Sequence, residues 1–131
     1  MEIVMKIDRC IDLTQSEEKL ATIIWREAPL MSPVLATLAL QEYDWKKSTT
    51  YTVLKKLCEK GIFRNEYAKI STVITRDELI SMQSRHYVEG TFGGSLPKFI
   101  ASFFDGKKLT EEQADELIKL IKDHKDGEGN G

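Results

Sequence analysis

Apolar side chains recur at helical spacing near the start of the chain. In "LTQSEEKLATIIWREAP", apolar positions such as Leu20 and Ile24 fall on one side of a helix. Thr14 can cap this helix, with Glu17 three residues later completing a capping box. Pro29 ends it, because the residue before a proline avoids the helical region. The pattern therefore predicts one amphipathic helix in this stretch.

Two more helices and a hairpin follow. Ser32 is a natural N-cap for the second helix, with Pro33 at its first position, and residues 30–31 can form a short strand. The third helix is predicted over residues 48–60, closed by Gly61 in the left-handed C′ conformation.

The third helix has two different faces. Its apolar face is expected to be buried and comprises Thr50, Val53, Leu54, Leu57 and Cys58. Its other face carries hydroxyl groups, a tyrosine and lysines, namely Ser48, Thr49, Tyr51, Thr52, Lys55 and Lys56. The next stretch, "IFRNEYAKISTVIT", is rich in β-branched and aromatic residues. It predicts a hairpin of two strands, at 62–67 and 69–74, although no Asn-Gly or Asp-Gly marks the turn.

The C-terminal part is predicted to be helical. Thr75 and Glu78 form a capping box that starts a helix running to about Glu89, and glycines at 90, 93 and 94 break it. Two short amphipathic helices follow, in "SLPKFIASFFDG" and "LTEEQADELIKLIKDH", the second with Thr110 and Gln113 as its capping box. The tail after residue 126 has nothing apolar to bury and is expected to be disordered.

The order of elements is typical of a winged helix-turn-helix. The predicted fold is mainly α, an α+β winged helix: an N-terminal domain with a two-stranded wing over residues 1–74, and a C-terminal helical domain over 75–126. The apolar stripes of the last helices could be an ordinary single-chain core, but three short helices bury little surface alone. A self-complementary dimer interface is the preferred interpretation. Its predicted residues are Leu96, Phe99, Ile100, Phe103, Phe104, Leu117, Ile118 and Ile121.

Charge is distributed unevenly. The formal charge of the 131 residues is −2, yet residues 43–69 carry seven basic against three acidic side chains, a balance of +4. Residues 75–131 carry eight basic and eleven acidic ones, a balance of −3. An acidic chain with one basic segment indicates a localised surface for an anionic partner.

Duplex DNA is the partner that this segment fits. It requires an element that enters the major groove, donors for base edges and cations for phosphates. The alternative is a solvated helix whose lysines only maintain solubility, and charge alone favours that alternative; the helical and hairpin context favours DNA. The candidate contacts are Lys46, Lys47, Ser48, Thr49, Tyr51, Thr52, Lys55 and Lys56 on the helix, with Asn65 and Lys69 on the hairpin.

No sequence signature of catalysis or of a cofactor is present. The chain lacks G-x-S-x-G, Walker and H-E-x-x-H motifs. Cys10 and Cys58 are interpreted as small buried or half-buried thiols, and His86 and His124 lack a second ligand at metal-binding spacing. No signal peptide and no apolar run of about 20 residues are present, so a cytoplasmic protein without a membrane partner is expected.

Three stretches together carry a family resemblance: "LTQSEEKLATIIW", "STTYTVLKKLCEKGIF" and "TFGGSLPKFIASFF". They resemble the penicillinase-repressor family of bacterial transcription regulators, which includes the β-lactamase and methicillin-resistance repressors and a copper-responsive branch. The resemblance runs from about Asp12 to Lys122. It implies a homodimer with an N-terminal winged-helix DNA-binding domain and a C-terminal helical dimerisation domain, which binds dyad operators and represses nearby genes.

The resemblance also concerns the release of repression. In the β-lactam branch a regulatory protease cuts within the dimerisation domain, and the matching bond here lies near Ser102–Phe103, where those repressors carry asparagine in place of Ser102. The hairpin is several residues shorter than is usual in the family. The C-terminal tail lacks the cysteine-rich metal hook of the copper branch.

Two other functions remain as hypotheses. The second hypothesis is a non-catalytic winged-helix module whose basic helix faces an acidic protein, and the third is an enzyme.

Overall fold

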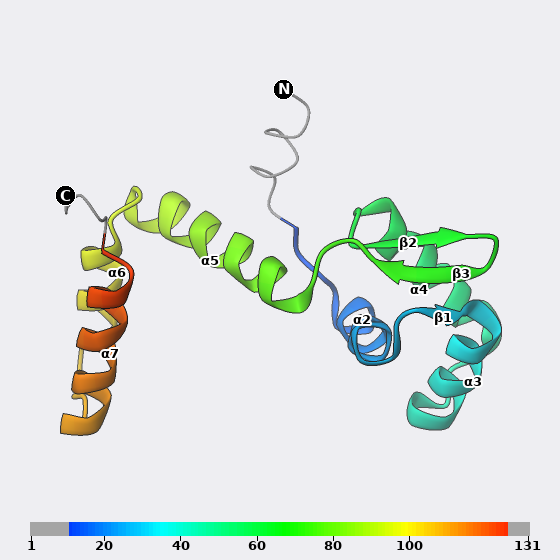
Figure 1. Ribbon diagram of the computed structural model, residues 1–131, viewed down its shortest axis with the longest axis horizontal. Coiled ribbons are helices and arrows are strands. Elements are labelled where there is room, and N and C mark those ends of the chain that lie inside the picture. Colours follow the sequence, from blue (N-terminus) through cyan, green and yellow to red (C-terminus); the bar gives the residue numbers. More distant parts are fainter. Residues whose placement is uncertain (1–10, 126–131) are drawn as a thin grey trace. The chain divides into compact units, whose positions relative to one another are not determined.

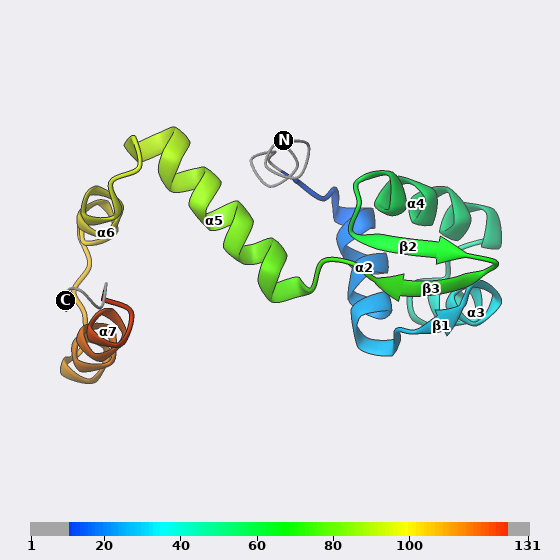
Figure 2. The same cartoon turned by 45° about the horizontal axis from the view of Figure 1, so that its top comes forward.

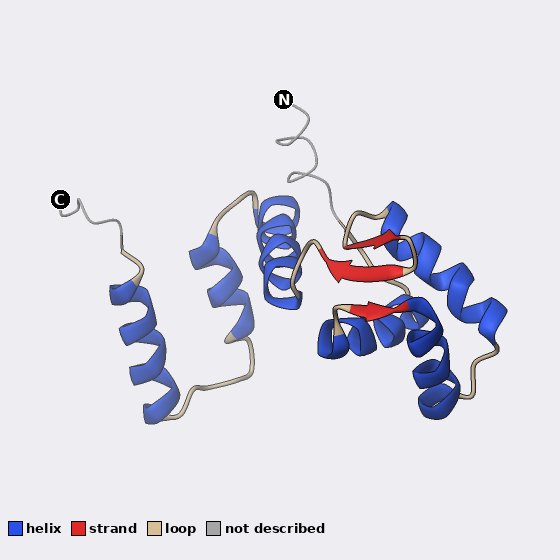
Figure 3. Cartoon of the chain, turned by 45° about the vertical axis from the view of Figure 1, so that its right-hand side comes forward, coloured by secondary structure: helices blue, strands red, loops and turns tan. Residues whose placement is uncertain are grey.

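The computed structural model describes residues 11–125, which fold into helices and one small sheet (Figures 1 and 3). Two compact units are present, one up to Tyr87 and one from Val88 onward, so their division falls within helix α5. The mainly helical winged-helix fold predicted from the sequence is confirmed. The elements are α2 (Gln15–Glu27), β1 (Leu30–Met31), α3 (Ser32–Tyr43), α4 (Lys47–Glu59), β2 (Phe63–Glu66), β3 (Lys69–Thr72), α5 (Arg76–Phe92), α6 (Leu96–Phe103) and α7 (Glu111–Asp123).

Helix α2 begins with the predicted capping box. The Thr14 N–H donates to Glu17 Oε1 at 2.8 Å, and the Glu17 N–H donates to Thr14 Oγ1 at 3.1 Å. The helix ends at Glu27, and Ala28, which precedes Pro29, is extended. Both ends of this element therefore follow from local chemistry.

The start of helix α3 differs from the prediction. Met31 is the N-cap residue, and Ser32, expected to be the cap, is the first helical residue and makes no side-chain cap. The Ser32 N–H instead donates to the carbonyl oxygen of Ala68 at 2.8 Å. The reason is tertiary: β1 pairs with β3, and this pairing reaches into the first residue of the helix.

The sheet has the order β1-β3-β2, with all neighbours antiparallel, and Figure 2 shows β2 and β3 as the long hairpin. The predicted hairpin and the short strand at residues 30–31 are both confirmed. Glu66 pairs with Lys69, so Tyr67 and Ala68 form a two-residue turn. Both have positive φ, 52° and 68°. Two-residue turns with positive φ at both positions usually contain Asn-Gly or Asp-Gly. This turn contains Tyr-Ala instead, so it could not be recognised from the sequence.

Helices α2, α3 and α4 enclose the core of the first unit together with the sheet. Leu20, Ile24, Leu35 and Leu57 are fully buried there. On α4 the predicted inner face is confirmed, since Thr50, Val53, Leu54 and Leu57 are buried and Cys58 is half-buried. Because this face is buried, the side chains on the opposite side of α4 are held facing outward.

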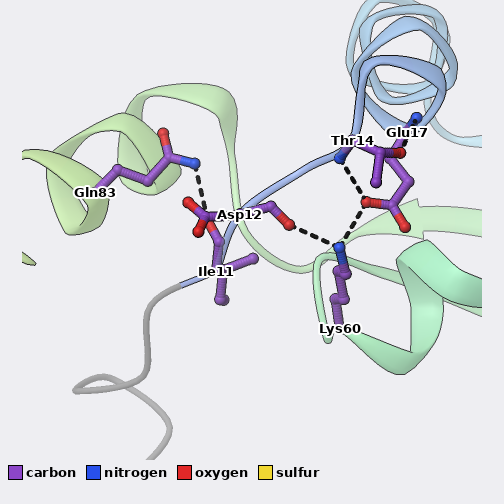
Figure 4. Close-up of polar contacts among 6 residues, drawn as sticks. All are labelled: Ile11, Asp12, Thr14, Glu17, Lys60 and Gln83. Atoms are coloured by element: carbon purple, nitrogen blue, oxygen red, sulfur yellow. Dashed lines mark hydrogen bonds and ion pairs between the residues drawn. The ribbon is translucent and has the colours of Figure 1, made fainter.

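The C-terminal end of α4 is anchored to the N-terminal end of α2 (Figure 4). Gly61 has φ 84°, as predicted, and its N–H donates to the Cys58 carbonyl at 3.0 Å, in the Schellman pattern of helix ends. The Lys60 ammonium donates to Glu17 Oε1 at 2.5 Å and to the Asp12 carbonyl at 2.6 Å. The side chain of Glu17 is 4% exposed, so this ion pair is almost fully desolvated on one side.

The pKa of Glu17 reflects these contacts. Burial by itself raises the pKa of the carboxyl group, but the hydrogen bonds from Lys60 and Thr14 and the charge of Lys60 lower it more. The pKa therefore lies below the ordinary value of 4.5. The folded state consequently prefers the ionised carboxylate.

Helix α5 starts at the predicted capping box, in which the Thr75 N–H donates to Glu78 Oε1 at 2.9 Å. It continues through Gly90 to Phe92, so the break predicted at Gly90 is wrong. A glycine inside a helix costs only about 1 kcal/mol, which the helix tolerates. The break occurs at Gly93 and Gly94, whose φ angles of 60° and 83° are incompatible with a right-handed helix.

The second unit contains α6 and α7; the capping box of α7 was predicted, whereas the Ser95 cap of α6 was not. Ser95 Oγ accepts from the Lys98 N–H, and Thr110 and Gln113 form a capping box. Neither helix has a buried residue.

Among residues 11–125 no helix combines the length and apolar character needed to cross a membrane. Cys10 and the predicted disordered tail at 127–131 lie outside the described residues.

We predict that Glu17→Gln destabilises the protein by about 1–3 kcal/mol near neutral pH, because a hydrogen bond between charged groups is lost. The folded pKa of Glu17 is lowered, so its stabilisation is complete above pH 4.5 and is lost as the pH falls through the folded value. Urea denaturation of both proteins at matched concentration, at about pH 7 and about pH 3, measures this. A difference that is independent of pH would contradict it.

We also predict that Thr50→Val stabilises the protein by about 0.5–2 kcal/mol. Among the described residues the fully buried Thr50 hydroxyl has no hydrogen-bond partner, and valine has the same shape without the polar atom. The control is Thr49→Val on the exposed side of the same helix, expected within about 0.5 kcal/mol of the parent. Destabilisation by Thr50→Val alone would show that the hydroxyl is satisfied.

Candidate nucleic-acid interface

The N-terminal end of α4 is uncapped. Its N-cap residue is Lys46, which makes no side-chain cap, and its first turn contains no acidic residue. Helices α2 and α7, by contrast, each have a capping box and two acidic residues in the first turn. The first N–H groups of α4 and the positive end of its dipole are therefore open to an anion.

The outer face of α4 presents cations and short hydroxyl side chains. Tyr51 is half-buried, and the Lys47 ammonium lies 6.0 Å from the centre of its ring. Among residues 11–125 no ion pair engages the lysines of this outer face. We call this face, together with the uncapped end, the α4 surface; its exposed members are Lys46, Lys47, Ser48, Thr49, Thr52, Lys55 and Lys56.

Lys60 does not belong to this surface. It is one of the seven basic residues that the sequence gathers in 43–69, but its ammonium pairs with the buried carboxylate of Glu17. The charge count from the sequence therefore overstated the free positive charge of the segment by one. No local pattern reveals this, because Glu17 lies 43 positions away.

A cleft separates α4 from the hairpin. It has a volume of about 560 Å³ and brings Tyr51 and Lys55 of α4 together with Asn65 of β2. Lys69 is exposed on β3 but does not line the cleft. Ser32, which was not among the residues predicted from the sequence, lines the cleft from the start of α3. Leu54, Cys58 and Ala68 complete the lining.

Cys58 is a half-buried thiol, as the sequence interpretation held. Burial raises its pKa, and the negative charge of Glu59 adds to the effect, so the thiol is protonated at neutral pH. His86 and His124 are both exposed. Within residues 11–125 no group of three or more histidine, cysteine, aspartate or glutamate side chains is arranged to hold a metal ion.

Several of the predicted interface residues of the second unit are large apolar side chains that are exposed to solvent. Phe103, Ile118 and Ile121 are 58%, 50% and 54% exposed. Phe99 is half-buried, with its ring 5.6 Å from that of Phe92. We call this set the C-terminal apolar surface; its other predicted members are Leu96, Ile100, Phe104 and Leu117.

Ser102 and Phe103, at the bond suggested for proteolysis, lie in the last turn of α6. The Ser102 hydroxyl donates to the Phe99 carbonyl at 2.7 Å. A protease needs an extended substrate, so cleavage at this bond requires the end of α6 to unwind.

Comparison with known proteins identifies relatives. The family model described as penicillinase repressor matches residues 13–123. The penicillinase repressor of Bacillus licheniformis is 20% identical over 117 residues, which cover 86% of this chain and 91% of that protein.

Proposed function

This chain belongs to the penicillinase repressor family, and from that premise we propose that it is a homodimeric transcriptional repressor that binds duplex DNA at a dyad operator. The observation that carries the proposal is the α4 surface. Four lysines, three hydroxyl side chains and an uncapped helix end lie together on α4, and among residues 11–125 none of these lysines is part of an ion pair. No catalytic step is proposed, and the protein acts in the cytoplasm, where its DNA lies.

The residues of the α4 surface divide into two roles. Short hydroxyl groups at Ser48, Thr49 and Thr52 approach base edges in the major groove. Lysines at the ends of the surface neutralise phosphates of the flanking strands, and the open N–H groups at Lys47 add to this. Tyr51 and Asn65, on opposite sides of the cleft, contact the backbone that passes between helix and hairpin.

Dimerisation is supported by the C-terminal apolar surface. Covering each exposed phenylalanine, leucine or isoleucine contributes about 1.5–3 kcal/mol, and one chain leaves this surface in water. A second copy offers the same surface, as a two-fold interface requires. Two linked DNA-binding units then combine modest half-site affinities through a high effective concentration.

Release from DNA is proposed to follow loss of the dimer. Cleavage at the Ser102–Phe103 bond by a regulatory protease would remove α7 and part of the apolar surface from each chain. The second candidate, a module that binds an acidic protein, has no separate observation in its favour. It becomes the conclusion if no duplex binds.

We predict a division of roles on DNA selected from a random duplex pool. Thr49→Ala and Thr52→Ala are expected to cost about 1–3 kcal/mol on the selected sequence and little on unrelated DNA, because they remove base contacts. Lys55→Gln and Lys56→Gln are expected to weaken both kinds of DNA alike and to reduce the salt slope by about 1. Fluorescence anisotropy titrations over a range of salt measure both effects.

The control for these titrations is Lys98→Gln on α6, which removes one exposed positive charge outside the α4 surface. It is expected to leave affinity and salt slope unchanged. Equal affinities of all four α4 variants and the parent would eliminate the assignment of α4 as the DNA-binding element.

We also predict that Phe103→Glu converts the dimer to a monomer at micromolar concentration, because a charge cannot be buried against an apolar partner surface. Sedimentation equilibrium measures the change. Lys98→Gln is again the control, since it alters the charge by the same amount on the opposite side of α6. A parent protein that is monomeric under these conditions would refute the proposed interface.

A further inference from the structure

The turn of the hairpin holds two residues in a conformation that side chains disfavour. Tyr67 and Ala68 have φ angles of 52° and 68°, where asparagine and glycine are the usual residues. For Ala68 the fold supplies a reason: its carbonyl accepts the Ser32 N–H at 2.8 Å, which joins the turn to the start of α3. Conformations of this kind persist only where the surroundings hold them.

For Tyr67 the fold supplies no such reason. The residue is fully exposed, with a relative accessible area of 101%. Among residues 11–125 it has no hydrogen bond and no ring contact, so the phenol contributes nothing visible to the stability of the unit. A bulky aromatic residue in a left-handed turn costs energy, and asparagine there would cost less. Among the described residues the phenol at the tip of the hairpin therefore has no structural role.

The position of the turn indicates which kind of external partner the phenol of Tyr67 could contact. Ala68, the next residue, lines the cleft together with Lys55 and Asn65, so the turn stands at the rim of the cleft beside the α4 surface. The turn is also fixed in place by the pairing of β3 with β1 and by the Ser32 hydrogen bond. When a helix lies in the major groove, the structural element beside it lies over a sugar-phosphate strand. Tyrosine hydroxyls are among the usual donors to phosphate oxygens.

We propose that Tyr67 is a DNA-contacting residue, whose hydroxyl donates a hydrogen bond to a backbone phosphate on the strand that flanks the groove occupied by α4. The proposal rests on the proposed function and adds a residue to it. A neutral donor releases no condensed counterion, so this contact adds affinity without adding to the salt slope. It also carries no sequence preference of its own.

The test compares Tyr67→Phe with the parent on the selected duplex and on an unrelated one. Loss of the hydroxyl is expected to weaken binding about 3- to 10-fold on both, with an unchanged salt slope. The matched control is Tyr43→Phe, where the ring lies 5.4 Å from the Lys19 ammonium and 5.8 Å from the Trp45 ring. Its affinity is expected to equal that of the parent.

A second variant separates binding from folding. Tyr67→Asn relieves the turn, so it is expected to raise the urea midpoint while weakening DNA binding at least as much as Tyr67→Phe. A lower midpoint would show that the ring stabilises the turn, and equal DNA affinity of Tyr67→Phe and the parent would show that the hydroxyl touches nothing; either result overturns the inference. If the parent protein itself binds no duplex, the proposed function fails, and the wing contact fails with it.

Discussion

The burial of one face of α4 is the constraint on which the rest of the molecule depends. Val53, Leu54 and Leu57 lie in the core shared with α2 and the sheet, so the helix cannot rotate without exposing them. At its end, Gly61 closes the helix and Lys60 joins it to the buried carboxylate of Glu17. With one face and one end fixed, the hydroxyl and lysine side chains and the uncapped N-terminus have a single orientation. A DNA-binding helix needs to be held rigidly in this way, because contacts to base edges tolerate little displacement.

The elements that could be predicted from the sequence are those that short-range chemistry decides. Thr14 with Glu17 and Thr110 with Gln113 define helix starts within four residues, and Gly61 defines an end by its own freedom of φ. The inner face of α4 follows from spacing alone.

The features that could not be predicted depend on residues far apart in the chain. Ser32 begins α3 with its N–H donating to the carbonyl of Ala68, 36 positions later, and it does not act as the cap of the helix. The turn at Tyr67 carries no turn signature, since the fold imposes its conformation from outside. Lys60 resembles the other lysines until Glu17 is found beside it. The C-terminal apolar surface is a different case: its residues could be recognised from their spacing, and the proposed second copy of the chain would cover them.

The central claim is that two copies of α4 lie in the grooves on one face of a duplex. Hydroxyl-radical footprinting of the parent protein on a selected duplex tests it most directly. We expect two protected patches on the same face of the DNA, related by dyad symmetry and about 10 base pairs or a multiple of that apart. A single patch, or two patches on opposite faces, would contradict the claim.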